Sequence, residues 1–149
     1  MGQYNLNNIN VIRTFPNEGV LIYGARTLSQ TLKDRYINVV RTLIYAQVSV
    51  SATLNKFVFR NNNGETWRKI DRLLTKFLEE MWKDGGLKGN SPSEAFFVRV
   101  GESGGVQTAS DTLEGRIITE VGIAPNRPGE FLVFRWSQFQ SEDGTITIL

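Results

Sequence analysis

Residues 65–83 carry the clearest alternation of apolar and polar positions in the chain. The apolar residues recur at i, i+3, i+4 and i+7 spacing: Trp67, Ile70, Leu73, Leu74, Phe77, Leu78, Met81 and Trp82. Charged residues occupy the opposite face, which is the pattern of an amphipathic helix with one buried side. Asp84-Gly85-Gly86 follows directly and predicts a glycine C-cap at the end of this helix.

A second helix is predicted from about Tyr36 to Leu54. Its apolar residues also follow helical spacing, namely Ile37, Val40, Leu43, Ile44 and Val48, and this spacing indicates a core-facing side. Either Asp34 or Asn38 is available as its N-cap. The segment Val48-Ser49-Val50-Ser51 favours a strand locally, so burial has to override propensity for the helix to continue through it.

Strand-like segments lie before and after the two helices. Expected strands are Ile9 to Phe15, Val20 to Tyr23, Phe57 to Phe59, Phe96 to Val100, Gly115 to Ala124 and Phe131 to Trp136. Turn residues join the first two strands and, through Pro125 and Gly129, the last two, so that each pair predicts a β-hairpin. The sequence Ser91-Pro92-Ser93-Glu94 predicts a capping box, and residues 110–114 one more turn of helix.

These elements predict an α+β fold: a mixed, largely antiparallel sheet packed against two main helices in a single domain. The expected domain covers residues 9–140. Residues 1–8 are polar and are expected to form a flexible N-terminal arm or the remnant of a linker. Residues 141–149 are expected to form a hinge followed by an arm strand.

The end of the chain, Thr145, Ile146, Thr147, Ile148 and Leu149, is a run of strong β formers. Such a tail can add as a strand to the sheet edge of another copy of the chain. It can equally fold back onto its own sheet, because both arrangements satisfy the same backbone hydrogen bonds. The pattern leaves both arrangements open.

Composition removes several classes of function. The 149 residues include no cysteine and no histidine, which excludes disulfides, thiol chemistry and the commonest general base. No recognisable set of nucleophile and base remains, so we expect neither catalytic residues nor a cofactor or metal site. No apolar segment is long enough for a membrane helix. The net charge of +2 is low for a dedicated nucleic-acid binder.

Four cations mark the polar face of the helix at residues 65–83: Arg68, Lys69, Arg72 and Lys76. A nucleic-acid-binding module is one interpretation of this face. However, Glu79 and Glu80 dilute its charge, and the aromatic residues that could stack on bases lie on the apolar side. A charged protein partner therefore fits this face better than nucleic acid does.

Five longer segments carry a family resemblance: INVIRTFPNEGVLIYGARTLS (9–29), RYINVVRTLIY (35–45), FVFRNNNGETWRKI (57–70), LEEMWKDGGLKGNSPSEAFFVRV (78–100) and GRIITEVGIAPNRPGEFLVFRWSQF (115–139). Together they resemble the C-terminal domain of contractile tail sheath proteins, which surround phage tails and related injection systems. The WKDGGLKG segment and the VGIAP turn are the most specific of these. One departure lies at Val39-Val40-Arg41, where the family has a more basic pattern.

The resemblance implies a structural, non-enzymatic role in a virion tail or contractile injection particle that is assembled in the bacterial cytoplasm. It implies other sheath subunits and the inner tail tube protein as partners, with no nucleic acid and no membrane. Residues 145–149 correspond to a C-terminal arm that adds a strand between subunits, and the helix at 65–83 is the candidate for tube contact. Known members carry further domains, so we expect the isolated chain to be a monomer or small oligomer.

Overall fold

Two long helices and an antiparallel strand pair form the body of the molecule. The computed structural model describes residues 9–129 together with two short strands near the C-terminus. In chain order the elements are β1 (Val11–Phe15), β2 (Gly19–Tyr23), α2 (Ile37–Asn55), α3 (Gly64–Lys83), α4 (Pro92–Ala95), β3 (Phe96–Val100), η1 (Glu102–Gly104), α5 (Ala109–Leu113), β4 (Thr119–Ile123), β5 (Phe139–Gln140) and β6 (Ile146–Thr147). The predicted α+β class with two main helices is confirmed.

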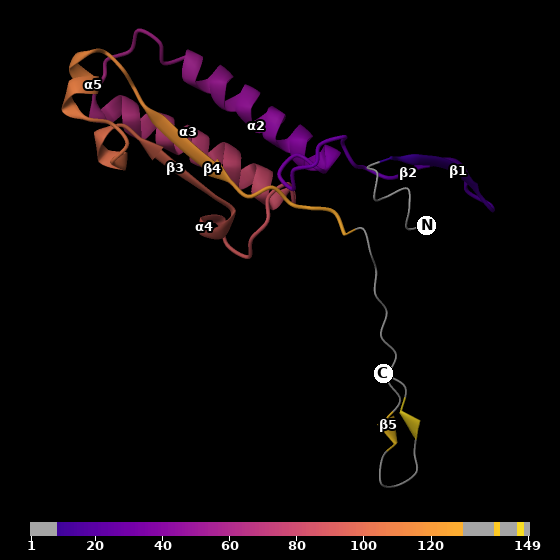
Figure 1. Cartoon of the computed structure of the whole chain (residues 1–149). Coiled ribbons are helices and arrows are strands. Elements are labelled where there is room, and N and C mark those ends of the chain that lie inside the picture. Colours follow the sequence, from indigo (N-terminus) through magenta and orange to yellow (C-terminus); the bar gives the residue numbers. More distant parts are fainter. Residues whose placement is uncertain (1–8, 130–138, 141–145, 148–149) are drawn as a thin grey trace.

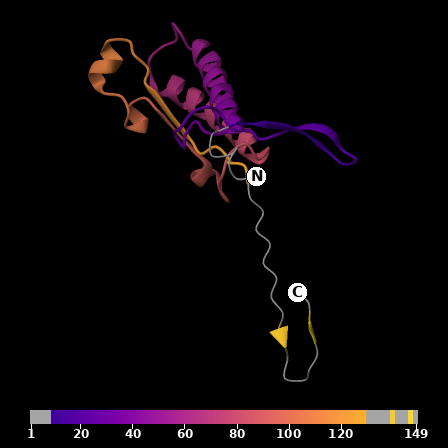
Figure 2. The ribbon, with the colours of Figure 1, turned by 45° about the vertical axis from the view of Figure 1, so that its right-hand side comes forward.

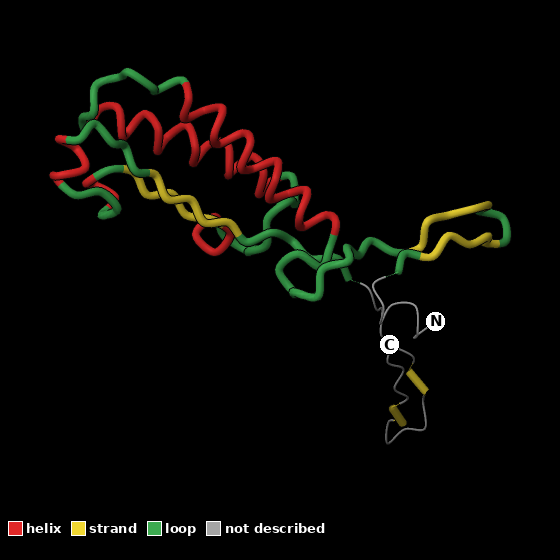
Figure 3. The backbone as a smooth tube through the Cα atoms, turned by 45° about the horizontal axis from the view of Figure 1, so that its top comes forward, coloured by secondary structure: helices red, strands yellow, loops and turns green. Residues whose placement is uncertain are grey.

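Helix α3 is the centre of the core. It lies beside α2, and both helices cover one face of the β3–β4 pair (Figures 1 and 3). Ile70, Leu74 and Leu78 are the most deeply buried side chains, each with at most 1% of its surface exposed. They fall on the predicted apolar face, so the 3.6-residue period of the sequence correctly identified the buried side of α3.

Both ends of α3 are capped, and the C-cap is the glycine cap that the sequence predicts. Asn63 Oδ1 accepts a hydrogen bond from the Thr66 amide at 3.0 Å. At the other end, the amide of Gly86 donates to Met81 O at 3.0 Å and that of Gly85 to Trp82 O at 2.9 Å. These two bonds form a Schellman motif, which requires the positive φ of 77° that Gly85 adopts.

Helix α2 begins differently from the prediction. Its N-cap is Tyr36, which makes no side-chain capping bond, so neither Asp34 nor Asn38 has that role. The side-chain amide of Asn38 instead donates to Asn126 O at 3.1 Å, and the backbone amide of Ile37 donates to Ala25 O at 3.0 Å. A tertiary contact thus replaces the local cap. The strand-prone segment 48–51 is helical, and Val50 packs against the core.

Two further local predictions are wrong. Residues 57–59 form turns rather than a strand, because the chain reverses there between α2 and α3; the Arg60 amide donates to Phe57 O at 3.0 Å. The predicted capping box at Ser91 does not form. Ser91 makes no capping bond, and Glu94 accepts from the Asn90 amide instead, at 2.9 Å.

Strands β3 and β4 pair antiparallel, with Val98 opposite Val121. Their inner side packs on the helices, while Phe97, Arg99 and Glu120 lie on the exposed outer side. The sequence predicted residues 115–124 to pair with residues 131–136. The partner seen for β4 is β3, and residues 131–136 lie outside the described residues.

Candidate interaction surfaces

The β1–β2 hairpin extends away from the rest of the molecule (Figures 1 and 2). It has the predicted register, in which Val11 lies opposite Tyr23 and Phe15 opposite Gly19. All five residues of β2 are exposed. Among the described residues, β1 and β2 pair only with each other, so both outer edges carry backbone groups available to another strand.

The base of this hairpin is held firmly against the start of α2. Asn10 forms two hydrogen bonds with the backbone of Arg26, at 2.8 and 2.9 Å. Arg26 in turn pairs with Tyr36, directly before α2. Gly24 packs so closely on Asn10 that a Cβ at this position would lie 2.7 Å from Asn10 Oδ1. These contacts fix the direction in which the hairpin leaves the body.

Helix α3 presents the four predicted cations on its exposed side. Two of them are paired with acids on the same helix: Lys69 with Glu65 at 2.6 Å and Lys76 with Glu80 at 4.0 Å. The Lys69 hydrogen bond and charge lower the pKa of the exposed Glu65 carboxyl. Within the described part of the chain Arg68 and Arg72 form no ion pair. Their charges are therefore the least neutralised by ion pairs on this face and the most available to a partner.

The charge of α3 is mixed rather than strongly basic. Its sequence contains five cations and four acids, and both signs lie on the exposed face. The aromatic Trp67 is 8% exposed, and its indole N–H is occupied by Asn62 Oδ1 at 2.8 Å. A nucleic-acid surface of this kind needs clustered cations with exposed aromatics for stacking. On α3 the cations alternate with acids and Trp67 is buried, so the geometry does not favour the nucleic-acid alternative.

The C-terminal tail is described only in part. Ile146 and Thr147 form β6, which pairs antiparallel with Phe139 and Gln140 of β5. The predicted arm residues Thr145, Ile148 and Leu149 lie outside the described residues, as does the predicted arm at 1–8. The strand character of the tail is thus seen at its centre, while its role between subunits stays a prediction.

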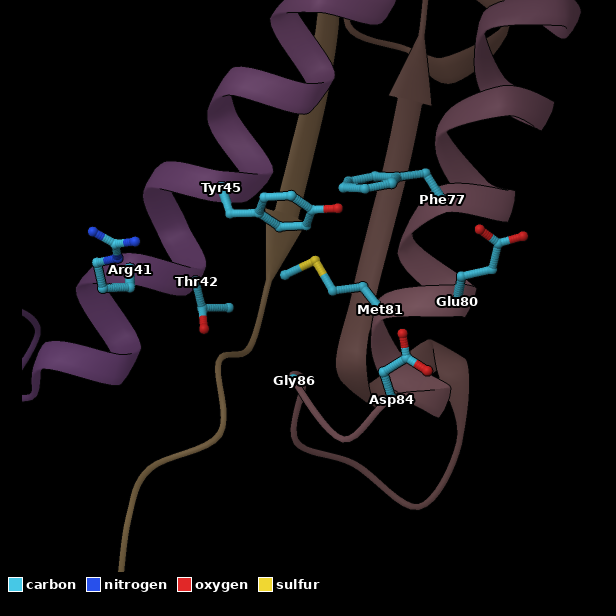
Figure 4. A pocket seen from close by; sticks show the side chains of 8 residues that line it. All are labelled: Arg41, Thr42, Tyr45, Phe77, Glu80, Met81, Asp84 and Gly86. Carbon is cyan, nitrogen blue, oxygen red and sulfur yellow. The ribbon is translucent and has the colours of Figure 1, made fainter.

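A groove of about 500 Å³ lies between the first half of α2 and the end of α3 (Figure 4). Tyr45 and Phe77 face each other across it, with ring centroids 5.8 Å apart. Its lining combines these rings with Met81 and with charged residues of both signs, including Arg41 and Asp84. The hydroxyls in this lining belong to Thr42 and Tyr45, and its carboxylates to Glu80 and Asp84.

The described residues contain no cluster of three or more potential metal ligands. A search of the same residues finds no helix with the length and apolar character needed to cross a membrane.

The sequence interpretation missed one surface, on α2. Ile37, Ile44 and Val48 were expected to face the core, but they are 43%, 52% and 62% exposed. The buried side of α2 carries Val39 and Ala46 instead. A signal was present: Arg41 is the only charged residue among the 19 of this helix, and apolar residues occur on more than one of its sides. Helices of that composition are usually covered on both sides.

Comparison with known proteins gives a consistent result. The family described as phage tail sheath C-terminal domain matches residues 29–139. A chain of the anti-feeding prophage baseplate is 36% identical, with a TM-score of 0.80, and the match covers 92% of this chain and 38% of that one. A chain of the PVC sheath complex, an extracellular contractile injection system in its contracted state, is 32% identical, with a TM-score of 0.85 and coverage of 95% and 40%.

The contracted helical sheath of the anti-feeding prophage gives a third match, 34% identical with a TM-score of 0.80, covering 93% of this chain and 38% of that one. The present chain thus spans about two fifths of the length of the chains it matches. No curated protein gives a significant match.

Proposed function

The chain belongs to the phage tail sheath C-terminal domain family, and from this premise we propose that it links neighbouring subunits of a contractile sheath and faces the inner tube. Its role is structural, in the tail of a contractile injection particle. The proposal has three specific parts: linkage between subunits, contact with the inner tube, and assembly of the particle in the bacterial cytoplasm. The projecting β1–β2 hairpin is the observation that supports it most directly.

Strand addition at this hairpin is the proposed link between subunits. A two-stranded hairpin is at best marginally stable alone in water, and three or more strands are needed for independent stability. The hairpin has exposed apolar residues and two open edges within the described part of the chain. An added strand would supply the missing backbone partners. Residues 145–149 of a neighbouring subunit are suited to this role, since they are rich in β-branched residues and charge-free.

Contact with the inner tube is proposed for the exposed face of α3. Arg68 and Arg72 there have no ion pair among the described residues, and both are solvent-exposed. They would attract a tube surface that carries acidic residues. The paired Lys69 and Lys76 contribute less, because their charges are partly neutralised on α3 itself.

The proposed work of the domain is mechanical rather than enzymatic. Subunits that stay linked by shared strands can repack as a sheath contracts, and this needs neither a cofactor nor a metal ion. We expect the 149-residue chain to be a monomer or small oligomer in solution.

Removing the tail tests the proposed link. Deletion of residues 144–149 from the full sheath protein is expected to abolish tubular assembly seen by electron microscopy, because the donated strand is lost. A Thr147→Pro variant keeps the length of the tail but removes a backbone donor, so it should impair assembly as well. As a control, Glu18→Ala changes an exposed residue of the hairpin turn and should assemble normally. Normal tubes from the deletion variant would contradict the proposal.

A further inference from the structure

Helix α2 has an outward-facing apolar stripe, defined here as Ile37, Ile44 and Val48, which are 43%, 52% and 62% exposed. Arg41, between them on the same side, is the only charged residue of the helix. By comparison, α3 has nine charged residues on a similar length. An apolar stripe of this kind on the solvent-facing side of a helix is typical of a surface that another protein covers.

The hairpin has a matching apolar face. Ile12 lies opposite Ile22, and Val20 lies two residues from Ile22 on the same side, because side chains alternate along each strand. These three side chains are 68%, 73% and 68% exposed. Strand addition would satisfy the edges of the hairpin but would leave this face in water. A second contact is therefore needed to cover it.

The two apolar surfaces cannot meet within one chain. The hairpin leaves from the first turn of α2 and points away from the helix (Figures 1 and 2). Its base is fixed by the Asn10–Arg26 hydrogen bonds and by the Arg26–Tyr36 bridge. Bending it back onto Ile44 and Val48 would break these bonds, so a partner for each surface has to come from another molecule.

We propose that the hairpin face Ile12, Val20 and Ile22 of one copy packs on the apolar stripe of α2 in a second copy. The two surfaces match in length. A five-residue strand is about 17 Å long, and the rise from Ile37 to Val48 along a helix is also about 17 Å. Both are apolar, and neither buries a charge except Arg41, whose long side chain can reach the rim.

The contact joins different surfaces of the two copies, so it can repeat from copy to copy and build an open helical array. Its area is small, on the order of 200 Å² per partner for a patch about 17 Å long and about 10 Å wide. A stable interface buries about 800 Å² per partner. The contact is therefore weak alone and can be trapped only at high protein concentration. In a sheath it orients copies that shared strands hold together, and in this respect it rests on the proposed function.

Disulfide trapping tests the contact directly, because the chain has no cysteine of its own. The Ile22→Cys/Val48→Cys double variant of the 149-residue chain, oxidised at high concentration, is expected to give a ladder of covalent dimers, trimers and larger species on a denaturing gel. Both positions are exposed, so folding should persist, and circular dichroism would verify this. Ile22→Cys with Lys83→Cys, an exposed position on α3, should give no ladder.

Three outcomes would overturn the inference. A cross-link within single chains would mean that the hairpin folds back on its own α2. Dimers from the Ile22→Cys or Val48→Cys single variants would mean that the surface concerned meets the same surface of another copy. The absence of all cross-links would mean that the surfaces do not meet. Repeating the experiment without residues 144–149 separates this contact from strand addition, since the ladder should persist at high concentration without the tail.

Discussion

A single glycine, Gly101, determines how closely the end of β3 packs on α3. A Cβ at this position would lie 2.4 Å from Cδ2 of the Trp67 ring, and the backbone φ is 62°. The ring cannot easily move away, because it is buried and its N–H is bonded to Asn62. Nothing in the sequence indicates that a tryptophan 34 residues earlier lies over this residue.

Gly101→Ala is therefore expected to lower the free energy of unfolding by about 2–4 kcal/mol, from the steric clash and the positive φ together. Gly105→Ala is the matched control. Gly105 lies in the left-handed region, with φ 70° and ψ 17°, and has open space around its Cβ, so its replacement should cost only about 1 kcal/mol. The ψ of −160° at Gly101 is almost restricted to glycine and adds to the cost there. Urea unfolding followed by tryptophan fluorescence measures both. Equal losses in the two variants would show that Trp67 does not constrain Gly101.

Among the elements, α3 could be predicted almost completely and α2 only in part. The ends of α3 are set by residues next to it in sequence, Asn63 and Gly85, and its single apolar face identifies the buried side. The start of α2 depends on Ala25 and Asn126, which are distant in sequence. Its apolar residues lie on two sides, so spacing alone could not distinguish the core side from the outward stripe.

Helix α5 provides a pH-dependent element, because its capping box depends on the ionised Asp111. The Thr108 hydroxyl donates to Asp111 Oδ2 at 2.6 Å, and the Thr108 backbone amide donates to the same oxygen at 3.0 Å. These hydrogen bonds, with a smaller contribution from Arg116, lower the pKa of Asp111 below its ordinary 3.8. A lowered pKa in the folded state means that the stabilisation is present above pH 3.8 and is lost as the pH falls through the folded-state pKa.

We accordingly expect the amides of α5 to exchange faster with solvent below pH 3.8, after correction for intrinsic rates, while those of α3 change little. Hydrogen exchange measured by NMR on the two helices would detect this. Asp111→Asn keeps an acceptor for the Thr108 amide but does not titrate, so it should remove the pH dependence. If α5 responds to acid equally in that variant, another group is responsible.

For the whole molecule, the remaining question is which side faces the inner tube. Arg68→Glu combined with Arg72→Glu in the full sheath protein is expected to weaken co-sedimentation with tubes by roughly tenfold, because two exposed charge contacts are each worth about 0.2–1 kcal/mol and repulsion adds to their loss. The loss should shrink as salt rises. Lys33→Glu combined with Lys88→Glu makes the same change in net charge at exposed loop positions.

This control separates a local contact from a general effect of charge. If both double variants lose binding equally, the tube responds to net charge and α3 has no special role. If neither loses binding, α3 faces away from the tube. Because α2 covers one side of α3 and β3 the other, a tube can reach only the outward arc that Arg68 and Arg72 share. Selective loss in the Arg68/Arg72 variant would therefore orient the whole domain, with the hairpin and the apolar stripe of α2 left for neighbouring subunits.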